Sequence, residues 1–170
     1  MRIGQGFDVH PFSDDPGRVL ILGGVRIEGA RGLSGHSDAD VVAHALADAV
    51  LGAAGLGDLG EQFPDSDPEW AGADSLMLLS EAVARAAAQG YRAINADCTV
   101  LAEAPRLSPH KGAMGDRLAA VLAAPVSVKA TTTERLGSIG REEGIACLAV
   151  VLLDDLPSAE TPSPSTAVPR

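Results

Sequence analysis

Three side chains in the first quarter of the chain are of types that bind a transition metal. Asp8 and His10 are separated by one residue, and His44 follows in a segment with the apolar periodicity of a helix. One carboxylate and two imidazoles leave the fourth position of a zinc ion open, as in catalytic zinc sites, whereas structural sites use four protein ligands. A short motif of this kind also occurs by chance, and His44 could equally be a buried, hydrogen-bonded histidine.

Two further groups of residues suit a phosphate. His36 and Ser37 precede the predicted helix, where free N–H groups and the helix dipole favour anions. The segment 131–134 (TTTE) offers three hydroxyls and a carboxylate, a combination that suits phosphate with bound Mg²⁺. Arg141 could donate two parallel hydrogen bonds to a phosphate. Each has a simpler interpretation: Ser37 as a helix cap, the threonines as a continued strand, and Arg141 as a solvated loop residue.

The strand that carries the first two metal candidates is predicted from its alternation. Residues 2–10 alternate with a period of two, so Asp8 and His10 share one face with Gly4 and Gly6. The two glycines leave room for a bulky group against the strand.

The helix that carries His44 is predicted over residues 37–54. Ser37 and Asp40 have the spacing of a capping box at its start. Asp40, His44 and Asp48 then form one stripe, and either carboxylate could accept a hydrogen bond from the imidazole N–H that faces away from the metal.

The remaining pattern predicts an α+β fold in a single domain, residues 1–154. It comprises one mainly four-stranded β-sheet with helices packed on one face, plus a small β-hairpin. Further strands are expected over 18–28, 91–102, 126–130 and 145–153, and further helices over 74–89 and after Ser108-Pro109. Residues 155–170, rich in Pro and Ser, are predicted to be a disordered tail.

The composition and charge of the chain indicate which partners, assembly and location to expect. Aromatic residues make up only 3% of the chain, so the core must be built from Ala, Val, Leu and Ile, and a homo-oligomer is expected. A net charge of -10 without a basic stripe argues against nucleic acid as a partner. Without a long apolar run the protein is expected to avoid membranes and to be cytoplasmic, with Cys98 and Cys147 reduced and buried. An anionic substrate would then need metal ions to offset the charge of the protein.

Seven motifs recur in the order and spacing of a known family. They are residues 4–10 (GQGFDVH), 36–40 (HSDAD) with His44, 57–60 (GDLG), 63–67 (FPDSD), 104–107 (APRL), 129–134 (KATTTE) and 140–146 (GREEGIA). Over residues 2–153 the chain therefore resembles the 2-C-methyl-D-erythritol 2,4-cyclodiphosphate synthases, lyases of the non-mevalonate isoprenoid pathway. The resemblance implies a homotrimer with active sites between neighbouring subunits. It also implies cyclisation of 4-diphosphocytidyl-2-C-methyl-D-erythritol 2-phosphate with release of CMP.

The resemblance also implies roles for individual residues. Zinc would be held by Asp8, His10 and His44, and a second cation, Mg²⁺ or Mn²⁺, by Glu134. His36 and Thr132 match positions that stabilise the transition state. The methylerythritol phosphate is expected to contact Asp58, Gly60, Phe63, Asp65 and Asp67, and the cytidine Ala102, Pro105, Arg106, Leu107 and Ser108. The CMP phosphates are expected to contact Thr131, Thr132 and Thr133. The other expected substrate contacts are Asp8, His10, His36, Ser37, Glu134 and Arg141.

Three positions depart from the family pattern. Ser138 stands where relatives often carry an aromatic residue of the central cavity, in which some members hold an isoprenoid diphosphate. Ala39 replaces a common Gly at a position expected to be helical, and Gln5 also differs. Two rival functions stay open: a zinc-dependent phosphohydrolase that releases a linear product, and a trimeric carrier of isoprenoid diphosphates.

Overall fold

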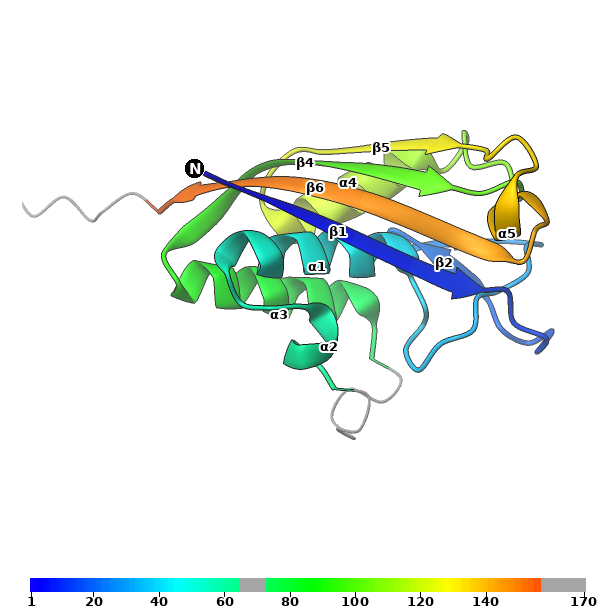
Figure 1. Ribbon diagram of the computed structural model, residues 1–170, viewed down its shortest axis with the longest axis horizontal. Coiled ribbons are helices and arrows are strands. Elements are labelled where there is room, and N and C mark those ends of the chain that lie inside the picture. The colour runs from blue at the N-terminus through cyan, green and yellow to red at the C-terminus, as the bar shows by residue number, and fades with distance from the viewer. Residues whose placement is uncertain (65–72, 157–170) are drawn as a thin grey trace, which may run out of the picture.

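The computed structural model describes residues 1–64 and 73–156. Its elements follow in the order β1 (Arg2–Pro11), β2 (Leu20–Leu22), β3 (Val25–Ile27), α1 (Val41–Ala54), α2 (Leu59–Gln62), α3 (Ser75–Ala88), β4 (Tyr91–Leu101), α4 (Lys111–Leu122), β5 (Val126–Thr131), α5 (Gly137–Gly140) and β6 (Gly144–Asp155). One four-stranded sheet carries the helices α1, α3 and α4 on a single face (Figure 1). The predicted α+β class and layer arrangement are confirmed.

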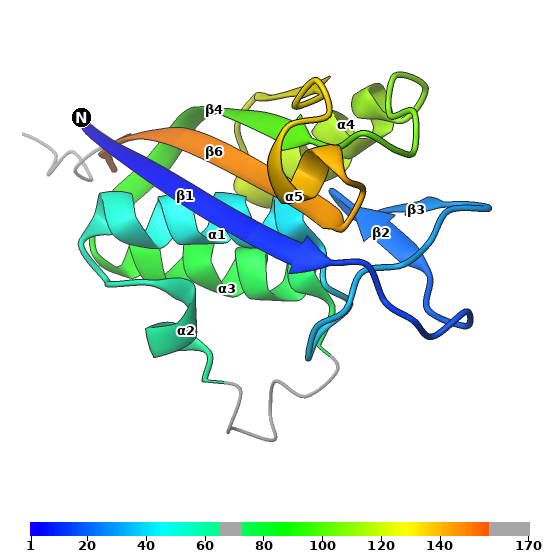
Figure 2. The ribbon, with the colours of Figure 1, turned by 45° about the vertical axis from the view of Figure 1, so that its right-hand side comes forward.

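The sheet pairs the first strand of the domain with the last strand that the structure describes. Its order is β1-β6-β4-β5, with β6 antiparallel to both β1 and β4, and β4 parallel to β5. β1 is an edge strand whose register pairs Asp8 with Cys147 and His10 with Ile145. Figure 2 shows the end of β1 beside α5 and the β2–β3 hairpin.

Two glycines set the distance between β1 and α1. A Cβ at Gly4 would meet the Ala49 carbonyl oxygen at 1.9 Å, and a Cβ at Gly6 would meet that of Ala45 at 2.0 Å. The bulky group for which these glycines leave room is therefore helix α1 itself. This close approach brings His44, on α1, toward Asp8 on β1.

Helix α1 begins later than the sequence predicts. Its N-cap is Asp40, whose side chain accepts hydrogen bonds from the backbone N–H groups of Val42 and Ala43. The predicted capping box at Ser37 is wrong, because residues 37–39 lie in the loop that precedes the helix. Ala39 has a φ of 59°, in the left-handed region that favours glycine, so the expectation that this position is helical is wrong.

Asp40 also ties the helix to the hairpin. The carboxylate is fully buried and accepts from the N–H groups of Gly23 (2.8 Å) and Gly24 (2.6 Å), which form the turn between β2 and β3. The single strand expected over 18–28 is thus two short strands. Burial raises the pKa of Asp40 to about 6, against the effect of these backbone hydrogen bonds.

Two other element boundaries differ from the prediction. A turn over 108–110 precedes α4, which has His110 rather than Ser108 as its N-cap. β6 runs through Asp155, one residue into the predicted tail, and residues 157–170 lie outside the described part of the chain. None of the helices in the described residues is long and apolar enough to cross a membrane.

The sheet face opposite the helices is apolar and open to solvent. Ile3, Phe7 and Val9 of β1 are 74%, 56% and 47% exposed, and Val150 of β6 is 43% exposed. Val150 pairs with Gln5, so it lies on the same face as these β1 side chains. An extended apolar surface of this kind is typical of an interaction site.

Candidate metal and substrate site

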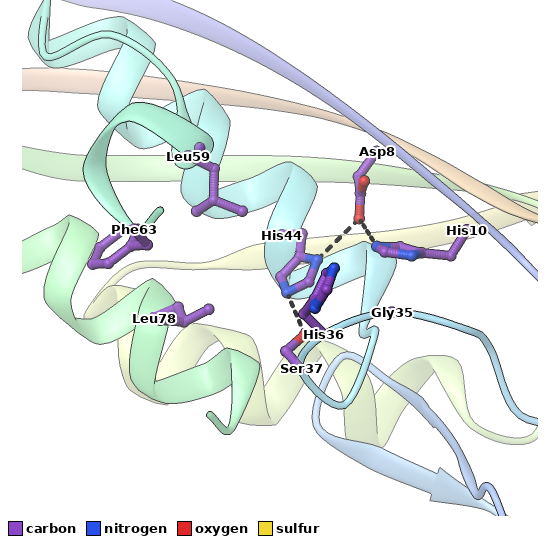
Figure 3. A pocket seen from close by; sticks show the side chains of 10 residues that line it. Asp8, His10, Gly35, His36, Ser37, His44, Leu59, Phe63 and Leu78 are labelled. Atoms are coloured by element: carbon purple, nitrogen blue, oxygen red, sulfur yellow. Dashed lines mark hydrogen bonds and ion pairs between the residues drawn. The ribbon is translucent and has the colours of Figure 1, made fainter. Parts of the chain in front are cut away.

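Asp8, His10 and His44 converge on one point between β1 and α1 (Figure 3). Asp8 Oδ2 lies 3.2 Å from His10 Nε2 and 3.1 Å from His44 Nδ1, and the three donor atoms lie within 4.8 Å of one another. Two donors on one tetrahedral zinc ion, with bonds of about 2.0–2.1 Å, are separated by about 3.3 Å. The two distances from Asp8 are close to this value, so the arrangement around Asp8 fits zinc.

The other nitrogen of each imidazole has an oxygen partner. His10 Nδ1 lies 2.7 Å from the Ser34 carbonyl oxygen, and His44 Nε2 lies 2.8 Å from Ser75 Oγ. With these partners accepting an N–H, the nitrogen nearer Asp8 can give up its own proton and coordinate a metal in place of its hydrogen bond to Asp8. Neither Asp40 nor Asp48 is the partner of His44, so that prediction is wrong: Asp40 caps α1 and Asp48 accepts from Leu59 N–H at 3.1 Å.

The electrostatics of the cluster keep the carboxylate ionised. Burial alone would raise the pKa of Asp8, but the hydrogen bonds with His10 and His44 outweigh it and hold the pKa well below its usual range. The hydrogen bond with Asp8 raises the pKa of His10, against the effect of burial. A deprotonated carboxylate is the form that a metal requires.

A cavity of 250 Å³, called the metal cavity below, opens in front of these three residues. It is lined by Asp8, His10, Gly35, His36, Ser37, His44, Leu59, Gly60, Phe63 and Leu78. Figure 3 shows the polar side chains on one side and Leu59, Phe63 and Leu78 on the other. The open side of the metal cluster thus faces a space with one polar and one apolar wall.

The structure brings some of the predicted methylerythritol-phosphate residues to this cavity. Gly60 and Phe63 line it, whereas Asp58 is not among its lining residues and instead caps α2 by accepting from Glu61 N–H at 2.8 Å. The remaining two, Asp65 and Asp67, lie outside the described residues.

A second cavity, of 280 Å³, lies where β4 and β5 end, and is called the strand-end cavity below. It is lined by Ala102, Glu103, Pro105, Arg106, Leu107, Ser108, Lys111, Ala130, Thr131 and Thr132. All five residues predicted for cytidine are therefore together, beside two of the predicted phosphate-binding threonines. Among the described residues of one chain, the two cavities share no lining residue.

Glu103, which the sequence did not single out, organises the loop after β5. Its Oε1 accepts from Thr133 N–H at 2.9 Å, from the Thr133 hydroxyl at 3.2 Å and from Arg135 N–H at 3.2 Å. Removal from water alone would raise the pKa of Glu103, but these hydrogen bonds outweigh it and lower the pKa. Glu134, with a φ of 52°, lies between the two bonded residues and accepts from the Thr132 hydroxyl at 2.9 Å.

Arg141 belongs to neither cavity. It follows α5, is exposed, and its Nε pairs with Glu143 Oε1 at 2.6 Å. Ser138, in α5, is also exposed. Their predicted relation to a central cavity concerns an assembly of chains and stays a prediction.

Ser75 and Asp38 were also missed by the sequence analysis. Ser75 is fully buried at the start of α3, and its hydroxyl donates to Asp38 Oδ1. The spacing gave no signal, because Ser75 and His44 are far apart in the sequence and meet only when α3 packs on α1. A serine that follows Asp74 at a helix start has an ordinary interpretation as part of a cap.

The chain is similar to known proteins over almost its whole described length. The model of the YgbB family matches residues 1–154. A 2-C-methyl-D-erythritol 2,4-cyclodiphosphate synthase of Alkalilimnicola ehrlichii is 56% identical over 156 residues, which cover 90% of this chain and 94% of that relative.

Solved structures agree with these relatives. A 2C-methyl-D-erythritol-2,4-cyclodiphosphate synthase in a form with bound CDP has a TM-score of 0.82 and 38% identity, covering 90% of this chain and 100% of that one. The bifunctional IspDF of Campylobacter jejuni has a TM-score of 0.86 and 47% identity, covering 91% of this chain and 42% of that one.

Proposed function

The chain belongs to the YgbB family, and we propose that it cyclises 4-diphosphocytidyl-2-C-methyl-D-erythritol 2-phosphate to 2-C-methyl-D-erythritol 2,4-cyclodiphosphate with release of CMP. It is then a lyase of isoprenoid precursor biosynthesis in the cytoplasm. The observation that carries the proposal is the metal cluster of Asp8, His10 and His44, which opens into a cavity lined by His36 and Ser37 in a chain of this family.

The proposed reaction is an intramolecular displacement. An oxygen of the substrate 2-phosphate attacks the β-phosphorus, the bond from that phosphorus to the bridging oxygen breaks, and CMP leaves with the bond's electron pair. Because both reacting groups belong to one molecule, the protein must fold the substrate and neutralise charge, and it needs no nucleophile of its own. His36 in the metal cavity and the Thr132 hydroxyl in the strand-end cavity are the proposed stabilisers of the transition state.

The cations are proposed to offset the charge of the substrate. Asp8, His10 and His44 would hold zinc, which when bound supplies a Lewis acid beside a phosphate oxygen. Glu134 would hold Mg²⁺ or Mn²⁺, since these ions take one or two carboxylates together with phosphate oxygens. Its exposed carboxylate, beside Thr132, supports this assignment.

The substrate contacts are proposed to divide between the two cavities. Ala102, Pro105, Arg106, Leu107 and Ser108 would hold cytidine, and Thr131 and Thr132 of the same cavity, with Thr133 of the adjoining loop, would hold the CMP phosphates. Gly60 and Phe63 would hold the methylerythritol phosphate in the metal cavity, where Ser37 is a further substrate contact. The solved relative with bound CDP supports a site for a cytidine nucleotide. Asp58 and Arg141 stay in the proposal as residues outside both cavities.

A homotrimer is part of the same proposal. One substrate must reach both cavities, which share no lining residue in a single chain, so a complete site would combine the metal cavity of one copy with the strand-end cavity of the next. The exposed apolar sheet face with Ile3, Phe7 and Val150 offers a surface for such association. An isoprenoid diphosphate is the proposed ligand of the cavity between the copies, near Arg141.

A phosphorus NMR time course with the purified protein, the proposed substrate and Mg²⁺ tests the function. Appearance of a cyclic diphosphate together with CMP is the expected result. CMP with a linear diphosphate would replace the proposal by a phosphohydrolase. No turnover by protein that retains zinc would refute the synthase and favour a carrier, which a titration with isoprenoid diphosphate would then examine.

A further inference from the structure

We propose that Ser75, held by Asp38, is a positioning residue that fixes the His44 imidazole for metal binding. The inference rests on the proposed function only in taking zinc as the metal of the cluster. Ser75 does not line the metal cavity and acts through His44. It would therefore control how tightly the metal is held.

The first support is the geometry at His44. The imidazole is 9% exposed as a side chain, its Nδ1 points to Asp8, and its Nε2 lies 2.8 Å from Ser75 Oγ. A buried imidazole that coordinates through Nδ1 must carry its proton on Nε2, and that proton needs an acceptor. Ser75 Oγ supplies one at the ordinary distance of a hydrogen bond.

The second support is the direction of the Ser75 hydroxyl. This hydroxyl donates to Asp38 Oδ1, and the backbone N–H of Ser75 donates to Asp38 Oδ2 at 3.3 Å. The hydroxyl hydrogen is thereby turned away from His44, and the oxygen lone pairs remain to accept from His44 Nε2–H. Asp38 thus selects the acceptor role of Ser75, which in turn selects the imidazole tautomer that can coordinate.

A competing partner is present but is less favourable. Ser37 Oγ lies 3.2 Å from His44 Nε2, farther than Ser75 Oγ, and already accepts from Ala39 N–H at 3.1 Å. Ser37 also lies on the partly exposed loop that lines the metal cavity, whereas Ser75 is fully buried on helix α3. The rigid, dry position suits a residue that must hold one orientation.

The experiment measures the zinc affinity of Ser75→Ala by competition with a chromophoric chelator, alongside the unfolding of the metal-free protein. Ser80→Ala is the matched control, since Ser80 is exposed on the same helix. Loss of a hydrogen-bond partner of a ligating histidine lowers metal affinity by about 10- to 100-fold, which is expected for Ser75→Ala and not for Ser80→Ala. Unchanged zinc affinity in Ser75→Ala would overturn the proposal.

A second readout separates positioning from general support of the fold. Because Ser75 acts through the metal, cyclase turnover by Ser75→Ala should recover when zinc is supplied in excess. Low turnover at saturating zinc with wild-type zinc affinity would contradict the positioning role. Failure of the wild-type protein to form a cyclic product would instead refute the proposed function, while the effect on zinc affinity could still be observed.

A variant at the far end of this chain of hydrogen bonds covers the case in which Ser75→Ala does not fold. Asp38→Ala removes the acceptor of the Ser75 hydroxyl and leaves all three metal ligands in place. Zinc affinity should fall several-fold, and Asp38→Asn, which keeps an acceptor oxygen, should restore part of it. Equal affinity in Asp38→Ala and the wild type would also overturn the proposal.

Discussion

Replacement of Gly6 by alanine should separate the two elements that form the metal cluster. The new Cβ would lie 2.0 Å from the Ala45 carbonyl oxygen and 2.7 Å from Ala49 N, both backbone atoms of α1 that cannot rotate aside. Even a tight contact requires 3.0 Å, so α1 and β1 must move apart by about 1 Å. Overpacking a core costs about 1–3 kcal/mol, and a clash with backbone places Gly6→Ala at the upper end.

The same movement should weaken zinc binding. His44 precedes Ala45 on α1, and Asp8 follows Gly6 on β1, so a separation of about 1 Å would lengthen the present 3.1 Å between His44 Nδ1 and Asp8 Oδ2. Ligand distances in a zinc site tolerate only about 0.2 Å. Gly6→Ala is thus expected to lose both stability and metal.

Urea unfolding of the metal-free protein and a chelator competition measure the two effects. A loss of about 3 kcal/mol corresponds to a fall in Tm of roughly 6–12 °C for a chain of this size. The matched control is Gly52→Ala on α1, where the new Cβ meets nothing within 4 Å. This exposed helical position should gain about 0.5–1 kcal/mol. A Gly6→Ala protein as stable as the wild type, with full zinc affinity, would refute the account of strand and helix packing.

Three further predictions concern the cluster, the hairpin and the loop after β5. His44→Ala should keep the circular dichroism spectrum but lose zinc and CMP release, and normal turnover without zinc would contradict the mechanism. The pKa of Asp40 is about 6 in the folded protein and 3.8 for an unperturbed aspartate, so between these pH values the folded state binds more protons than the unfolded state. The contribution of this carboxyl to the free energy of unfolding therefore falls as pH rises from about 4 to 6. Urea titrations across that range should show a smaller decline for Asp40→Asn, and identical slopes would argue against the raised pKa. Glu103→Ala, which removes the acceptor of three hydrogen bonds to the loop, should raise the KM for the cytidyl substrate while leaving zinc affinity unchanged, as calorimetry and initial rates can establish.

The local sequence pattern was sufficient to predict the position of a side chain where that position depends only on the strand or helix that carries it. The alternation of residues 2–10 placed Asp8 and His10 on one face, and the apolar helix pattern placed His44 opposite them. The resemblance to a family supplied the residues proposed to bind cytidine, which gather at the ends of β4 and β5 from segments that periodicity cannot relate.

Prediction failed where a contact between distant segments decides the structure. Asp40 was predicted at the N3 position of a capping box, but it is the N-cap itself, accepting from Val42 and Ala43 N–H, and its carboxylate is also held by Gly23 and Gly24 of the hairpin. Ser75 and Glu103 had no recognisable motif, because their roles depend on partners about 30 residues away. Side chains that organise others are therefore harder to find than side chains that bind metal directly.

The pairing of β1 with β6 implies an order of events during synthesis. β1 leaves the ribosome first and β6 last, and within the sheet β6 is the only neighbour of β1 among the described strands. A nascent chain that still lacks residues 144–155 lacks the strand that pairs with residues 2–11, so only the contact with α1 can orient Asp8 and His10 toward His44. Long-range strand pairing of this kind is slow to form. The proposed zinc site is therefore complete only after β6 has paired with β1.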